Sequence, residues 1–243
     1  MEVRMNEQPS APMLPPPSGV SGWITTWREA LTRPNENTYA RIALSPEAKL
    51  STAFLWVFLG SLVNFLLASL VQGRLMSQMM QNSGIEGLPA GAGGGLLTAI
   101  CGAPIGALIS VVFFAIGVGV FQLIAKMFGG HGTYEQLAYA LAAIVTPFYF
   151  VSGVITLLSA IPIPFVGACF GLLGFGIALY VLYLEITAVK GVNRFGWGAA
   201  IASVLLPVFV IACCVAVGIF SIFSMLAPEA AEIFESMMTP TVP

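Results

Sequence analysis

The sequence contains no aspartate, since all 11 of its acidic residues are glutamate. This absence excludes aspartyl-phosphate pumps, intramembrane aspartyl proteases and lipid-headgroup transferases that hold metal ions with clustered aspartates. Its one histidine, His131, has no second imidazole with which to share a metal ion. The motifs HExxH, GxSxG, GxxxxGK[ST] and CxxC are also missing. A Ser-His dyad needs none of these motifs, although nothing in the sequence marks one. We therefore expect a protein without catalytic residues, cofactors or a metal site.

Charge is scarce as well. Only 8% of the residues are charged, whereas 58% are hydrophobic, and soluble domains carry about 25% charged residues. So few charges cannot cover the surface of a soluble globule of this size, and lipid is the expected solvent. The formal net charge of -2 gives no indication of a nucleic-acid partner.

Long apolar runs dominate the chain between residues 46 and 227. Each is long enough for a membrane-spanning helix, which needs about 20 residues, and none alternates in polarity as a membrane β-strand would. The sequence predicts an all-α integral membrane protein with a bundle of five transmembrane helices. The four cysteines lie in or beside these runs and predict packed thiols rather than disulfides. The predicted helices cover about residues 50–71, 103–128, 137–161, 165–189 and 198–226.

The distribution of lysine and arginine predicts the orientation of this bundle. Five basic residues precede the first apolar run, and an inside N-terminus puts eight basic residues in the cytoplasm and one outside. Because cytoplasmic loops carry the excess of basic residues, we expect the N-terminus inside and the C-terminus outside. Abundant glycine and alanine with little lysine favour the inner membrane of a bacterium.

The polar N-terminal region has two parts. Residues 1–20 are rich in proline and predict a disordered tail. Residues 21–45 predict a cytoplasmic amphipathic helix and a linker, because Trp23, Trp27 and Leu31 recur at i+4 spacing on one helical face. This face either lies at the membrane surface, where it could meet a protein partner, or packs on the transmembrane bundle.

Three further boundaries follow from local residue types. Ser45 and Pro46 suit the N-cap and first position of a helix, so the first membrane helix is expected to begin near Pro46. The glycine-rich stretch 87–95 predicts an outer loop. Residues 228–243 form an acidic C-terminal tail.

The stretch "GGHGTYEQ" predicts a short turn between the second and third membrane helices. Gly129 suits a helix stop, and Thr133 with Gln136 has the spacing of a capping box at a helix start. His131 falls in the turn, where it is an exposed residue or, as the alternative, a proton-transfer or metal-binding group.

Several polar and small residues lie inside the apolar runs. Asn64 and Gln122 predict hydrogen bonds between helices. Glu185 has two interpretations. It is either a structural carboxylate that lies near the membrane surface or bonds to a tyrosine, or an ion site on a transport pathway. The pairs Gly102–Gly106 and Gly167–Gly171 predict close helix packing, within one chain or between the chains of a homo-oligomer.

Longer stretches carry a family resemblance: "WREALTRPNENTYARIA", the "GGHGTYEQLAYALAAIVTPFY" turn and helix, and "YVLYLEITAVKGVNRFGWGAAIASVLLP". The chain resembles the prokaryotic form of the Yip-one family, the Ypt/Rab-interacting proteins, from about Gly22 to Leu226. The resemblance implies a five-helix bundle with a cytoplasmic N-terminus that engages protein partners and other family members. The family's Tyr-Gly-Pro-type motif is not evident, which leaves GTPase binding open.

The expected function is therefore that of a non-enzymatic membrane scaffold or adaptor. It would act through a cytoplasmic protein partner and through association of its helices. The alternative is a small transporter or permeability protein that uses Glu185.

Overall fold

The computed structural model describes residues 19–82, 92–159 and 166–238, and the regular secondary structure in these ranges is helical throughout. Two short helices, α1 (Val20–Thr32) and α2 (Glu36–Ala43), precede five long ones. Each long helix contains an apolar stretch of at least 20 residues, enough to cross a membrane. The protein is thus a multi-pass membrane protein with five candidate spans, as its sequence predicted. The long helices are α3 (Leu50–Asn82), α4 (Ala92–Met127), α5 (Tyr134–Ser159), α6 (Val166–Asn193) and α7 (Trp197–Met238).

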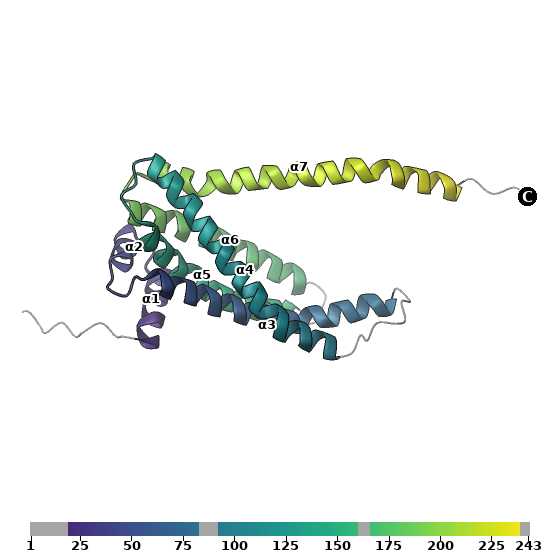
Figure 1. Ribbon diagram of the computed structural model, residues 1–243, viewed down its shortest axis with the longest axis horizontal. Helices are drawn as coiled ribbons and strands as arrows, with labels where there is room; N and C mark the ends of the chain where they lie inside the picture. Colours follow the sequence, from purple (N-terminus) through teal and green to yellow (C-terminus); the bar gives the residue numbers. More distant parts are fainter. Residues whose placement is uncertain (1–18, 83–91, 160–165, 239–243) are drawn as a thin grey trace, which may run out of the picture.

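Helix α5 lies at the centre of the bundle. It packs against α3 on one side and α6 on the other, and it also contacts α1, α2 and α4. Its segment Leu137–Ile144 is buried along its whole length. Four of these eight residues are alanines, and small side chains let neighbouring helices approach closely. Figure 1 shows α7 diverging from the other helices toward its C-terminal end.

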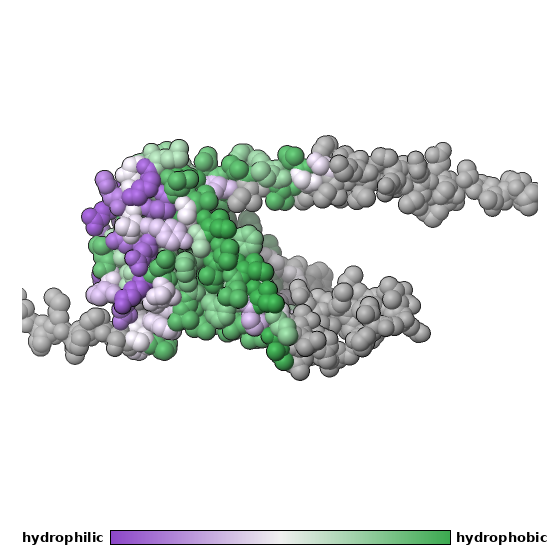
Figure 2. All heavy atoms as spheres, viewed as in Figure 1, coloured by the Kyte–Doolittle hydropathy of each residue, from purple (hydrophilic) through white to green (hydrophobic). Residues whose placement is uncertain are grey.

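The molecule has one hydrophilic end. Figure 2 shows hydrophilic residues gathered at the end formed by α1 and α2, and hydrophobic residues over the helices beyond it. Many apolar side chains on these helices are exposed in the isolated chain. The exposed fraction is 70% for Phe113 and 75% for Leu172. Exposed apolar surface on this scale suits contact with lipid tails. We call the part made by α1, α2, the α4–α5 turn and the α6–α7 turn the polar end.

Helix α3 begins later than predicted. Residues 45–49 form a turn, in which the Ala48 N–H donates to the Ser45 carbonyl at 3.0 Å, so the helix starts at Leu50 rather than near Pro46. The Leu50 N–H donates to the Glu135 carboxylate at 2.9 Å. A carboxylate from another helix therefore caps α3, which local residue types could not indicate.

Other predicted boundaries also differ. The expected loop at 87–95 is wrong for Ala92–Gly95, which are helical, and residues 87–91 lie outside the described ranges. Helix α3 continues to Asn82 and α7 to Met238, beyond the predicted ends, so much of the acidic tail is helical. The predicted tail before residue 19 lies outside the described ranges.

The cysteines do not pack as expected. Cys101, Cys169, Cys213 and Cys214 are free and exposed. Their thiols therefore lie on the outer surface of the bundle, because a helix that crosses lipid can face it with any apolar residue.

Candidate functional site

The tryptophans of α1 attach this helix to the bundle. The ring of Trp23 lies 5.9 Å and that of Trp27 5.5 Å from the ring of Trp56 on α3, both in edge-to-face arrangements, which aromatic pairs prefer. Trp56 is completely buried, and Leu31 also packs against the core. The sequence left two alternatives for the face formed by Trp23, Trp27 and Leu31, the membrane surface or the bundle. In the structure this face packs on the bundle. The Tyr180 hydroxyl of α6 adds a 2.6 Å hydrogen bond to the Leu31 carbonyl.

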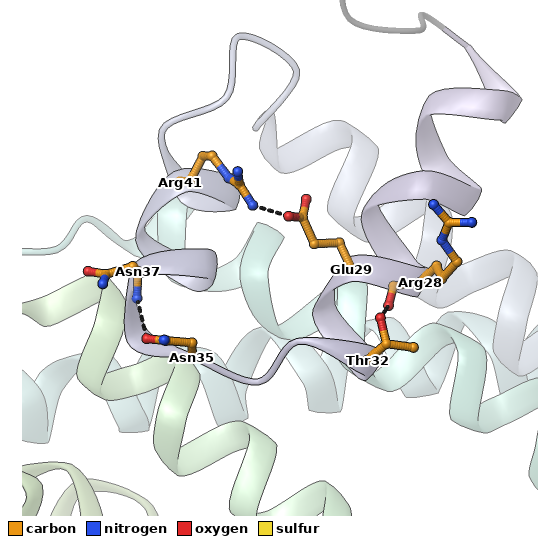
Figure 3. Close-up of polar contacts among 6 residues, drawn as sticks. All are labelled: Arg28, Glu29, Thr32, Asn35, Asn37 and Arg41. Atoms are coloured by element: carbon orange, nitrogen blue, oxygen red, sulfur yellow. Dashed lines mark hydrogen bonds and ion pairs between the residues drawn. The ribbon is translucent and has the colours of Figure 1, made fainter.

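Helix α2 also holds α1 in place. The Tyr39 hydroxyl donates to the Ala30 carbonyl at 2.7 Å, and burial raises the pKa of Tyr39 well above its ordinary value. Arg41 forms an ion pair with Glu29 (Figure 3). The Asn35 side chain accepts a hydrogen bond from the Asn37 N–H at 3.1 Å, and it so caps the start of α2 (Figure 3).

A second ion pair joins α2 to the end of α6. Lys190 pairs with Glu36 and also lies 4.4 Å from the ring centre of Trp197. Gly191 lies directly against the Glu36 backbone, so that an added Cβ would lie 3.1 Å from the Glu36 carbonyl carbon. We call α1 and α2 together the cap; its position on the bundle is fixed by aromatic packing, hydrogen bonds and these ion pairs.

The cap has a face that turns away from the bundle. Val20 and Ile24, one turn apart on α1, are 64% and 57% exposed. Arg28 continues the same row, and Figure 3 shows it pointing away from the Arg41–Glu29 pair. Within the described ranges neither Arg28 nor Arg33 forms an ion pair. We call Val20, Ile24, Arg28 and Arg33 the outward face. A surface hollow of about 290 Å³ adjoins it, lined by Thr25, Arg28, Glu29, Thr32 and Arg33.

The α4–α5 turn has the geometry that its sequence predicted. Gly129 adopts a positive φ of 82°, which favours glycine. The Gly130 N–H donates back to the Ala125 carbonyl at 2.8 Å. Thr133 and Gln136 form the capping box, with bonds of 3.0 and 3.3 Å between side chain and backbone. The predicted stop and start signatures are confirmed.

His131 contributes its backbone to this region. Its N–H donates to the Asn193 carbonyl at 3.2 Å, while its side chain is exposed. The described residues contain no group of three histidine, cysteine or acidic side chains that could hold a metal ion.

Gln122 joins three segments at the polar end. Its side-chain amide donates to the Gly132 carbonyl at 2.6 Å and to the side-chain oxygen of Asn193 at 3.2 Å. Asn193, at the end of α6, is completely buried, and its own amide donates to the Val189 carbonyl. Asn64 makes a similar link deeper in the bundle, from α3 to the Tyr149 carbonyl of α5 at 3.0 Å. Both side chains make the interhelical bonds that the sequence suggested.

Glu185 lies on α6 inside the bundle, and its side chain is half-buried. It lines a cavity of about 340 Å³ between α4, α5 and α6. Tyr149 lines the same cavity. Within the described ranges the structure shows no hydrogen bond to this carboxylate, and so it does not show the tyrosine hydrogen bond considered from the sequence.

Residues 28–219 match the family model of the Yip1 domain. The chain belongs to the Yip1 domain family. No curated protein and no solved structure matches it. The matched region begins inside α1 and ends in α7, so this Yip1 domain includes most of the cap and all five candidate spans. It lies within the range over which the sequence resembled the Yip-one family.

Sequence reasoning missed several residues of the polar end. Asn193 joins α4 to α6, Tyr39 joins α2 to α1, and Trp56 receives both α1 tryptophans. Asn193 stands between "VKGV" and "RFG" at the end of an apolar run, where a polar residue is expected in any case. Its position next to Gln122 could be seen only in three dimensions.

Proposed function

We propose that this Yip1 domain is a non-enzymatic membrane adaptor whose polar end lies in the cytoplasm and binds a protein partner. The observation that carries the proposal is the attachment of α1 by Trp23 and Trp27 to Trp56. This attachment uses the tryptophan face inside the molecule and leaves the outward face free at a fixed position.

The composition of the outward face indicates the chemistry of the partner. Two exposed apolar side chains adjoin two arginines without ion-pair partners among the described residues. Arginine is enriched where proteins bind one another, and exposed apolar side chains there can be buried by a partner. A partner segment with acidic and apolar groups fits this face. The tryptophans then act indirectly, because their loss would release α1 from the bundle.

Site-specific photo-crosslinking in cells tests this proposal. A photoreactive residue at Ile24 should give one discrete protein adduct, and Leu44 on the same end of the molecule should give the same adduct. Both positions are more than half exposed. Arg28→Glu together with Arg33→Glu should remove the adduct, because the charge that attracts acidic groups is reversed.

Phe113 provides the matched control, because it is exposed on the lipid-facing surface and should give no protein adduct at this mass. Adducts with lipid alone from Ile24 would show that the outward face meets a membrane surface and would exclude the adaptor proposal. An adduct that survives both arginine changes would exclude the acidic partner.

A second candidate function is transport, which the position of Glu185 beside an intramembrane cavity favours. Ionisable groups inside a membrane often mark the path of an ion or substrate. Flux of candidate ions into proteoliposomes would be measured for the wild type and for Glu185→Gln. Flux that the substitution abolishes would replace the adaptor proposal with transport.

A further inference from the structure

The cavity beside Glu185 opens toward the lipid-facing surface, because Phe113 in its lining is 70% exposed. Most of its wall is aromatic or aliphatic, for example Phe113, Phe121 and Leu141, and its titratable groups are Glu185 and Tyr149. Its volume of about 340 Å³ lies in the range of small-molecule sites. An ionisable carboxylate at membrane depth is costly, and such groups often mark a functional site.

The cavity has the shape of a groove that follows the helices. Its lining on α4 runs from Ser110 to Phe121, which corresponds to about 16 Å along a helix axis. Glu185 lies eight residues before the end of α6 at Asn193, or about 12 Å from the polar end. The carboxylate therefore sits among apolar walls, and a ligand there needs a charged group and an apolar chain together.

The charge of the site selects the head of that ligand. Among the described residues, no arginine, lysine or histidine lines the cavity. The nearest basic residue along α6, Lys190, is already paired with Glu36. A phosphate group would therefore have no cationic partner in the cavity, whereas an ammonium group would meet the Glu185 carboxylate.

We propose that this cavity binds a single-chain amphiphile with an amine head, such as a long-chain alkylamine. The ammonium group pairs with the Glu185 carboxylate, and the alkyl chain lies along the aromatic wall of α4. None of the lining residues belongs to α1 or α2, so this site stands apart from the adaptor proposal.

The test uses dodecylamine with a photoreactive diazirine in its chain, added to the full chain in nanodiscs of neutral lipid. The sites of labelling are mapped by mass spectrometry. The matching alcohol has the same chain and no charge, so it partitions into the bilayer without pairing to a carboxylate. In the wild type we expect the amine to label the cavity peptides of α4 and α5 at least about tenfold more strongly than the alcohol. Unlabelled dodecylamine should compete.

Two variants and a control assign the preference to the cavity. Glu185→Gln should make amine and alcohol labelling equal, because the ionic partner is lost. Gly117→Leu should reduce labelling by both probes, since Gly117 lines the cavity and an added Cβ there meets open space. Gly176→Leu adds the same side chain in open space at a position outside the cavity lining and should change nothing.

Equal labelling by amine and alcohol in the wild type would overturn the proposal. So would an amine preference that survives Glu185→Gln, or labelling that Gly117→Leu and Gly176→Leu affect alike. If Glu185→Gln does not fold, two results still test the proposal. They are the ratio of amine to alcohol labelling in the wild type and the difference in labelling between the two glycine variants. Loss of crosslinks from Ile24, by contrast, bears on the adaptor proposal alone.

Discussion

The side-chain amide of Gln122 on α4 donates a hydrogen bond to the side-chain oxygen of Asn193 on α6, 71 residues later in the chain. Both side chains are buried. The same amide reaches the Gly132 carbonyl, and the Asn193 carbonyl accepts from His131. These bonds hold α4, the α4–α5 turn and α6 together at the polar end. Because water cannot replace a lost partner there, each bond should matter more than an exposed one.

Substitution of Asn193 should measure this link. Asn193→Ala is expected to lower the free energy of unfolding by about 1–3 kcal/mol, because the buried amide of Gln122 loses a partner. Asn64→Ala is the matched control, since Asn64 makes one partly exposed interhelical bond, and it should cost about 0.6 kcal/mol. The free energies of unfolding of the two variants would be compared by titration with a denaturing detergent. Equal losses would contradict the role assigned to Asn193.

The α4–α5 turn offers two substitutions two residues apart. Thr133→Ala should cost about 1 kcal/mol, because the hydroxyl that accepts the Gln136 N–H is removed. His131→Ala should change stability by less than about 0.5 kcal/mol, since alanine keeps the backbone N–H that bonds to Asn193 and the side chain is exposed. Thermal melting in detergent compares them. A larger loss from His131→Ala would show that the imidazole has a function.

Tyr39 predicts a dependence of stability on alkaline pH. Burial raises its pKa in the folded state, so the stabilisation is complete below the unfolded pKa of about 10 and is lost as pH rises through the folded value. Tyr39→Phe should lessen the loss of melting temperature above about pH 10. At neutral pH it should cost about 1 kcal/mol, because the bond to the Ala30 carbonyl is lost.

Tyr180→Phe is the control for this prediction. Its hydroxyl also bonds to a carbonyl of α1, but Tyr180 is 40% exposed, so the cost should be smaller. A Tyr39→Phe variant that melts like the wild type at neutral pH would contradict the role of this bond in holding the cap.

The open glycines of α6 predict self-association. A Cβ added at Gly167 or Gly171 meets nothing within 4 Å, so this face could receive a helix of a second chain. A variant with Cys169 as its only cysteine should form a disulfide-linked dimer on oxidation, and Gly171→Leu should prevent it. In the control variant with Cys101 alone, dimers should be absent, because Gly106 on the same helix already packs on Phe65. Equal yields from both cysteines would contradict this interface.

The long helices and the capped turn could be predicted because their causes are local. An apolar run of about 20 residues has one low-energy form in a membrane, a helix. The Thr133–Gln136 box likewise depends on residues three positions apart. Val20, Ile24 and Arg28 recur at the same i+4 spacing as Trp23, Trp27 and Leu31. The sequence therefore predicts both rows of α1, but only the structure shows which of them faces the bundle.

Tertiary contacts explain what the sequence did not show. Helix α2 has only eight residues, and isolated helices so short are marginal in water. Burial of Tyr39 and Ile42 and the ion pair from Glu36 to Lys190 stabilise it. The start of α3 depends on Glu135, which is 85 residues away from Leu50 in the sequence. No local pattern could have placed either feature.

The most direct test of the adaptor account is the side of the membrane on which the cap lies. Ile24→Cys, in a chain without other cysteines, would be treated with a membrane-impermeant maleimide in sealed right-side-out vesicles. Thr241→Cys in the same background serves as the control for the outer side. The account predicts that the cysteine at position 24 is labelled only after permeabilisation and that the one at 241 is labelled at once. Immediate labelling at position 24 would place the polar end outside and contradict a cytoplasmic partner.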